Sequence, residues 1–163
     1  MKRFGIMAAG VLLSFILQTS LLGFFDILGI IPNISLILVV IFALMSDGVT
    51  GGIIGLMTGI LYDGMLYDVF GVYTLAYFVI GAVIGSYSDN MMRENYLAYC
   101  AAAGVSTVAM HLMVYVLLFF LKYSVESAVF AFRSVAVETV LNTLLTVMVL
   151  KFVLFIFGRL NLK

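Results

Sequence analysis

Charged residues are scarce in this sequence, and long parts of it contain none. Asp, Glu, Lys and Arg make up 10% of the 163 residues, whereas hydrophobic residues make up 65% and the mean hydropathy is +1.27. Four stretches carry no charge: residues 4–25, 27–46, 69–88 and 95–121. Each has about 20 residues or more, enough to cross a hydrocarbon layer roughly 30 Å thick as a helix. The chain has too little polar surface for a water-soluble globule, so the sequence predicts a helical integral membrane protein.

Cysteine and histidine are nearly absent, which argues against several kinds of site. A single cysteine, Cys100, excludes an internal disulfide and is interpreted as a small packing residue. Because the sequence also contains a single histidine, we expect no zinc or haem site and no cofactor. Basic residues are neither in excess nor clustered, so nucleic acid is not an expected partner. Gly-rich phosphate loops, His-Glu-x-x-His, Cys-x-x-Cys and Gly-x-Ser-x-Gly are also missing, and no enzyme is predicted.

Six membrane spans account for almost the whole chain. Pro32 disfavours helical geometry at Ile31 and separates the first two spans, and Ser46-Asp47-Gly48 forms a turn before the third. The expected spans are residues 4–25, 33–45, 49–62, 72–87, 96–121 and 134–157. The first is interpreted as an uncleaved span rather than a signal peptide. Short connections predict one all-α transmembrane domain, a six-helix up-and-down bundle with no separate soluble domain.

The expected orientation follows from the basic residues near the ends of the short loops. With the N-terminus in the cytoplasm, most of them face inward, which predicts that both termini are cytoplasmic. The inward set is Lys2, Arg3, Arg93, Lys151, Arg159 and Lys163, and the outward set is Lys122 and Arg133. The turn at Asp47 would lie inside yet carries no basic residue, so a five-span or re-entrant arrangement there stays an alternative.

Small residues recur at helical spacing in three of the expected spans. Gly51, Gly55 and Gly59 follow one another along one face of the third span, which leads to Asp63. The others are Gly81 and Gly85 in the fourth span and Gly5, Ala9, Gly10 and Ser14 in the first. Such strips let a second helix approach closely. That helix belongs either to a partner protein or to the same bundle, and the spacing does not choose between them.

Two aspartates follow the glycine strip of the third span. Asp63 and Asp68 could form a protease pair, because two acids that share a proton can activate water. Capping and solvation of a Gly-rich loop is the alternative, and we favour it.

Polar residues also lie inside the last two spans. His111 is near the middle of the fifth, and Glu138, Asn142 and Thr146 share a face in the sixth. Counting helical rises from the outer ends places His111 closer in depth to Asn142 and Thr146 than to Glu138, which Arg133 could neutralise. A proton or solute path is one interpretation, and interhelical hydrogen bonds that fix the register are the other.

Several short motifs occur in an order that one protein family shares. They are Gln18-Thr19 late in the first span, Ile31-Pro32-Asn33 opening the second, Gly59-Ile60-Leu61-Tyr62-Asp63 closing the third, Gly71 and Leu75-Ala76-Tyr77 leading to Gly81, and Asn142 in the last. With these motifs the chain resembles the MreD family of rod shape-determining proteins, most closely over residues 15–85. Two positions depart from the family: the turn at Asp47 is usually basic, and Asn33 replaces a commoner Asp.

The resemblance implies a non-catalytic scaffold of the bacterial cytoplasmic (inner) membrane, involved in regulating cell shape and lateral peptidoglycan synthesis. The implied partners are MreC, the MreB filament through other components, and the peptidoglycan glycosyltransferase and transpeptidase of the elongation complex. The first-span strip and the glycine face of spans three and four would dock transmembrane helices of MreC or a synthase. In such a scaffold Asp63, Tyr73, His111, Glu138 and Asn142 would be paired inside the bundle. Gln18, Asn33 and Tyr77 are further polar residues expected within the membrane or at its border.

The family also resembles, in helix arrangement, the substrate-binding subunits of energy-coupling-factor transporters. That likeness gives the alternative function, a substrate-binding subunit for a small solute such as a vitamin. Its polar pocket would be lined by Asp63, Tyr73, His111, Glu138 and Asn142.

Overall fold

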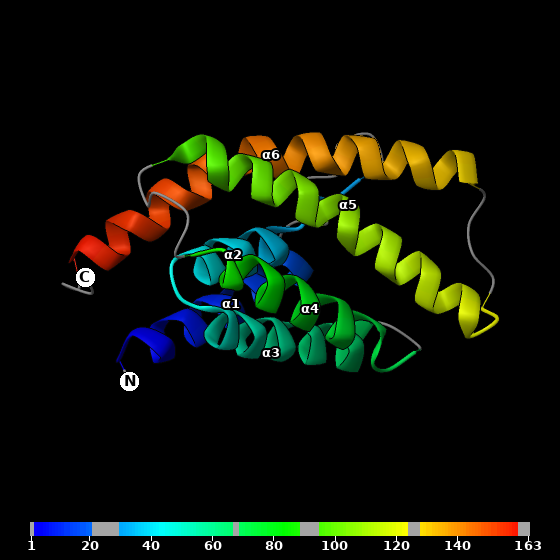
Figure 1. Ribbon diagram of the computed structural model, residues 1–163, viewed down its shortest axis with the longest axis horizontal. Helices are drawn as coiled ribbons and strands as arrows, with labels where there is room; N and C mark the ends of the chain where they lie inside the picture. Colours follow the sequence, from blue (N-terminus) through cyan, green and yellow to red (C-terminus); the bar gives the residue numbers. More distant parts are fainter. Residues whose placement is uncertain (1, 21–29, 67–68, 89–94, 124–127, 160–163) are drawn as a thin grey trace.

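The fold was analysed in a computed structural model that describes residues 2–20, 30–66, 69–88, 95–123 and 128–159. Within these residues the chain forms six α-helices (Figure 1). They are α1 (Lys2–Ser20), α2 (Ile34–Leu44), α3 (Gly48–Leu66), α4 (Val72–Ser86), α5 (Tyr96–Phe120) and α6 (Ala128–Arg159). The all-helical prediction is confirmed.

The helices lie where the charge pattern placed six spans, with differences at α3 and α6. Both are longer than predicted, because α3 continues past Asp63 and α6 begins before Arg133. A single charged residue does not by itself end a helix, since a charged side chain leaves the backbone hydrogen bonds of the helix intact. Residues 21–25 of the first predicted span lie outside the described residues.

The shortest helix, α2, occupies the centre of the bundle. It packs against each of the other five helices, and Ser35 to Leu44 are all buried. Its 11 residues rise about 16 Å, roughly half the thickness of a hydrocarbon layer. Asn33 caps its start by accepting a hydrogen bond from the Leu36 backbone N–H at 2.9 Å.

Three of the described helices are long and apolar enough to cross a membrane, by length and composition. They are Arg3–Ser20, Tyr96–Phe120 and Phe132–Arg159. The helices α2 and α4 are apolar but shorter. The six crossings expected from the sequence stay a prediction.

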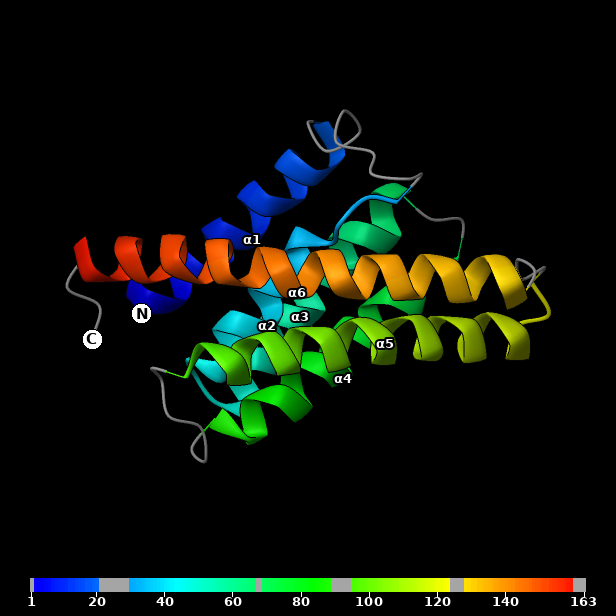
Figure 2. The same ribbon diagram turned by 90° about the horizontal axis from the view of Figure 1, so that it is seen from above.

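The helices form two groups. The pair α5 and α6 runs antiparallel along one side of the molecule, and α1 to α4 gather on the other side (Figures 1 and 2). The end of the pair where α5 stops and α6 starts extends beyond the other helices in both views.

One end of the bundle brings together the start of α1, the α2–α3 turn and the end of α6. The Arg3 guanidinium donates a hydrogen bond to the carbonyl oxygen of Met45, at the end of α2. The same guanidinium lies over the Phe157 ring, 5.9 Å from its centroid. Although the α2–α3 turn carries no basic residue of its own, Arg3 supplies a positive charge beside it. The start of α1 and the end of α6 therefore lie on the same side of the molecule.

Candidate functional site

The glycines of α3 and α4 bring the backbones of these two helices into contact. A Cβ atom added to Gly51, Gly55 or Gly81 would come within 3.0 Å of backbone atoms of the facing helix, a distance that real Cβ atoms essentially never show. A Cβ on Gly59 would meet the backbone of Tyr73 and Thr74 in the same way. The two backbones touch without intervening side chains, so this glycine face is covered by the chain itself.

This geometry changes one expectation from the sequence. A partner helix cannot dock on Gly51, Gly55 and Gly59 while α4 occupies them, and Gly85 likewise faces the backbone of Asp47. The spacing predicted a close approach, but it could not identify the approaching helix. Two interpretations were left open for this strip. In the structure the glycines pack against a helix of the same chain, α4.

The small residues of α1 lie on two different faces. Gly5 and Ala9 are exposed, and an added Cβ on Gly5 would meet nothing within 4 Å. Gly10 instead faces the Phe42 ring of α2, 3.2 Å from an added Cβ. Ser14 is buried, with its hydroxyl 3.2 Å from that of Ser35. Gly5 and Ala9 are thus open to another molecule, whereas Ser14 joins α1 to α2.

Asp63 caps the start of α4. Its carboxylate accepts hydrogen bonds from the backbone N–H groups of Gly71, Tyr73 and Thr74 at 2.9, 3.0 and 2.8 Å, and from the Thr74 hydroxyl at 2.6 Å. Gly71 is the N-cap residue and has no side chain, so Asp63 of α3 satisfies amides that the helix itself cannot. Asp68 lies outside the described residues. The geometry of Asp63 is that of a structural cap.

A buried polar network joins α5, α6 and the start of α2. The Asn142 amide donates to the Thr107 hydroxyl at 3.0 Å, and its oxygen accepts the Asn33 backbone N–H at 2.8 Å. Asn33 also accepts from the Tyr77 hydroxyl at 3.0 Å. Each described polar group here has a partner on another helix, which fixes how the helices align.

The partner of His111 differs from the one expected. His111 Nε2 lies 2.7 Å from Glu138 Oε2, so the depth estimate that placed it nearer Asn142 and Thr146 is wrong, and His111 rather than Arg133 faces Glu138. In an antiparallel pair the residue numbers of opposed positions have a constant sum, and Thr107 with Asn142 shares the sum of His111 with Glu138. The error came from starting the last helix at residue 134 instead of 128.

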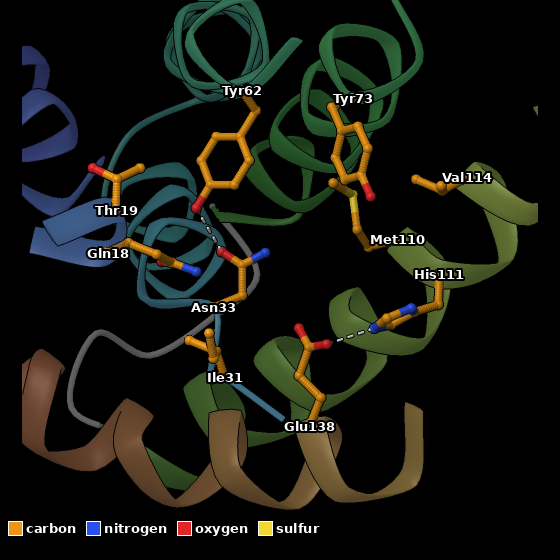
Figure 3. A pocket seen from close by; sticks show the side chains of 10 residues that line it. All are labelled: Gln18, Thr19, Ile31, Asn33, Tyr62, Tyr73, Met110, His111, Val114 and Glu138. Carbon is orange, nitrogen blue, oxygen red and sulfur yellow. Dashed lines mark hydrogen bonds and ion pairs between the residues drawn. The ribbon is translucent and has the colours of Figure 1, made fainter. Parts of the chain in front are cut away.

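A polar cavity of about 380 Å³ lies beyond the start of α2. Because α2 begins only at Ile34, the space along its axis is left to side chains of α1, α3, α4, α5 and α6. The cavity is lined by these side chains and by two residues that precede α2: Gln18, Thr19, Ile31, Asn33, Tyr62, Tyr73, Met110, His111, Val114 and Glu138 (Figure 3). The sequence singled out Gln18, Asn33, Tyr73, His111 and Glu138, whereas Asp63 and Asn142 of the expected pocket do not line the cavity.

Some lining residues were missed, although Tyr62 had a readable signal. Its ring packs 5.3 Å from that of Phe15 and 5.3 Å from that of Tyr77, and its hydroxyl lies 3.4 Å from Asn33 Oδ1. Tyr62 follows Gly59 by three residues, so the two lie on the same side of α3, the side on which the glycine strip predicts a close neighbour. Met110 and Val114 gave no such signal, because apolar residues look alike whether they face lipid or a cavity.

An apolar groove of about 520 Å³ runs between α1 and α6 over α2. Its walls carry Gly10, Leu13 and Leu17 on α1, and Phe152 with Ile156 on α6. Many large apolar side chains of α1, α5 and α6 are exposed, including Leu13 at 56% and Phe152 at 62%. In water this exposure would be unfavourable, and it is consistent with a membrane protein.

The fold and this site define a class: an apolar helical protein in which a network of polar side chains joins several helices, with no group of three His, Cys, Asp or Glu placed to hold a metal among the described residues. A family model described as rod shape-determining protein MreD matches residues 1–157. The chain therefore belongs to the MreD family. No curated protein and no solved structure matches the chain, so the likeness to energy-coupling-factor subunits stays a prediction.

Proposed function

We propose that this chain is a non-catalytic membrane scaffold of the bacterial cell-elongation complex, with both termini in the cytoplasm. The observation that carries the proposal is the family match over residues 1–157, since the family is one of rod shape-determining proteins. The three helices long enough to cross a membrane support the location. Arg3 and Arg159 lie on the described ends of α1 and α6, which agrees with an inward-facing basic side.

The contact surface that we propose for MreC is the exposed face of α1. In the contacts among described helices, α1 packs mainly against α2 and α3, which leaves its outer face open. Gly5 and Ala9 lie on that face with exposed Leu12 and Ile16. Small residues one turn apart let a partner helix approach closely in lipid, where van der Waals packing drives association. The wall synthases and MreB would join through MreC.

Co-purification with MreC tests this surface. Replacing Gly5 and Ala9 together by Leu should reduce recovered MreC at least tenfold, because the bulky side chains hold the partner helix away. Gly158→Leu is the matched control, since an added Cβ there also meets nothing within 4 Å. It should leave recovery within twofold of wild type. Full recovery of MreC by the double variant at normal expression contradicts the surface.

The tests with Leu at Gly55 and Gly59, which the sequence alone would suggest, are uninformative about partners. Both positions face the backbone of α4, so those variants disrupt the fold itself. The transporter alternative needs a separate measurement. A stoichiometric vitamin retained by the purified protein in native mass spectrometry would favour it over the scaffold.

A further inference from the structure

The polar cavity and the apolar groove adjoin one another along α1. On α1, residues between Ile6 and Leu17 line the groove, and the next residue, Gln18, lines the cavity. On the floor, the groove ends at Ile34 and the cavity includes Asn33. The two form one depression between α1 and α6, apolar over most of its length and polar at the end of α1 that carries Ser20.

The groove is long and slender. The stretch from Ile6 to Leu17 rises about 17 Å. A volume of about 520 Å³ over that length gives a mean cross-section of about 30 Å². A space of this length and section accommodates one hydrocarbon chain.

The length of the groove is close to one leaflet of a bilayer. Half of a hydrocarbon layer roughly 30 Å thick is about 15 Å. The polar end of the depression lies near the described end of α1. A lipid whose headgroup lies at the cavity would therefore place one chain in the groove.

The cavity walls carry one carboxylate, Glu138, that can accept hydrogen bonds from an ammonium headgroup beside its contact with His111. Glu138 is 13% exposed and uses one oxygen for His111 and the other for Asn142, which leaves further lone pairs to accept hydrogen bonds. Across the cavity, the side-chain oxygen of Gln18 accepts a hydrogen bond from the Ser35 backbone N–H. The amide nitrogen of Gln18 therefore points into the cavity as a donor (Figure 3). No Lys or Arg is among the lining residues that the structure describes, which disfavours headgroups whose charge is purely negative.

We propose that this depression binds one phospholipid with a primary ammonium headgroup, of the phosphatidylethanolamine type. The ammonium donates to Glu138, the Gln18 amide donates to the phosphate or ester oxygens, and one acyl chain fills the groove. The proposal rests on the membrane location proposed above but not on the contact with MreC, which uses the separate face at Gly5 and Ala9.

Native mass spectrometry of the full chain tests the site. The protein is reconstituted in vesicles of phosphatidylethanolamine, phosphatidylcholine and phosphatidylglycerol in equal amounts with matched chains, then released in mild detergent. We expect one phosphatidylethanolamine to be retained at least fivefold over each of the other two. Phosphatidylcholine is the informative competitor, because its quaternary ammonium cannot donate hydrogen bonds to Glu138.

Two neighbouring substitutions separate the groove from ordinary lipid contact. Leu13→Trp fills the groove and should lower retained phosphatidylethanolamine at least fivefold, whereas Leu12→Trp, on an exposed position that does not line the groove, should leave it within twofold. Glu138→Gln should bring the three lipids within twofold of one another.

Equal retention of the three lipids by the wild type overturns the proposal without any variant. Equal loss from Leu12→Trp and Leu13→Trp overturns it too, since that pattern describes a non-specific lipid shell. A retained vitamin or polypeptide in place of lipid would also overturn it. If the protein retains the lipid but does not recover MreC, only the proposed MreC surface is refuted. The failure of the lipid site and the failure of the proposed function are therefore distinguishable.

Discussion

Adding one methyl group at Gly55 should destabilise the protein strongly, although the same change elsewhere should stabilise it. Ala is a better helix former than Gly by about 1 kcal/mol, so helix propensity alone favours Gly55→Ala. The new Cβ, however, would collide with backbone atoms of Tyr77 and Phe78, which cannot turn away as a side chain can. Its accommodation requires α3 and α4 to move apart.

The magnitude follows from the balance of these two effects. Overpacking typically costs about 1–3 kcal/mol, and a clash with backbone belongs at the upper end. After the gain in propensity, Gly55→Ala should lose about 2 kcal/mol of unfolding free energy. Gly5→Ala on exposed α1 meets nothing within 4 Å and should gain up to about 1 kcal/mol. The two variants should therefore differ by about 3 kcal/mol.

The single cysteine provides a convenient assay. Cys100 is partly buried in α5, so a thiol-reactive dye should report its exposure as the protein unfolds on heating in a fixed detergent. For a chain of this size, about 3 kcal/mol corresponds to about 6–12 °C in Tm between the two variants. A Tm for Gly55→Ala equal to or above wild type would refute the backbone contact between α3 and α4.

Three further predictions concern the polar groups. Asp63→Ala should lower stability by about 3 kcal/mol in the same thermal assay, with Asp63→Asn in between, because buried amides of α4 lose their acceptor; equal stability of the two variants would contradict this. In a double-mutant cycle, His111→Ala and Glu138→Ala should show a coupling of about 1 kcal/mol, and zero coupling would mean that the pair at 2.7 Å contributes nothing. The pKa of Asp47, in the α2–α3 turn, lies below its ordinary 3.8 because the Thr50 backbone N–H donates to the carboxylate. Its stabilisation is complete above the unfolded pKa and is lost as the pH falls through the folded pKa, so wild type should lose up to about 1 kcal/mol more than Asp47→Asn between pH 5.5 and 3.

Much of the fold could be predicted because charges and caps mark where helices stop. Pro32 and Asn33 located the start of α2, and the turn at Asp47 located the start of α3. The partner of the glycine strip could not be predicted, since a bare backbone suits any helix. The His111–Glu138 pair was missed because its register depends on where α6 begins. The predicted start was placed after the charged residue Arg133, whereas α6 begins at Ala128 and continues through Arg133.

The short central helix connects the stable part of the molecule with its candidate site. The sequence of an apolar helix such as α2 does not indicate whether lipid or protein surrounds it. In this structure five helices bury α2. Because α2 begins only at Ile34, the backbone N–H groups at its start lie inside the bundle, where each unpaired group costs several kcal/mol in lipid. Side chains from other helices satisfy them, Gln18 at Ser35 and Asn142 at Asn33. Those side chains make the space beyond the start of α2 polar. The short length of α2 therefore allows this helix to lie at the centre of the core and also leaves room for the cavity.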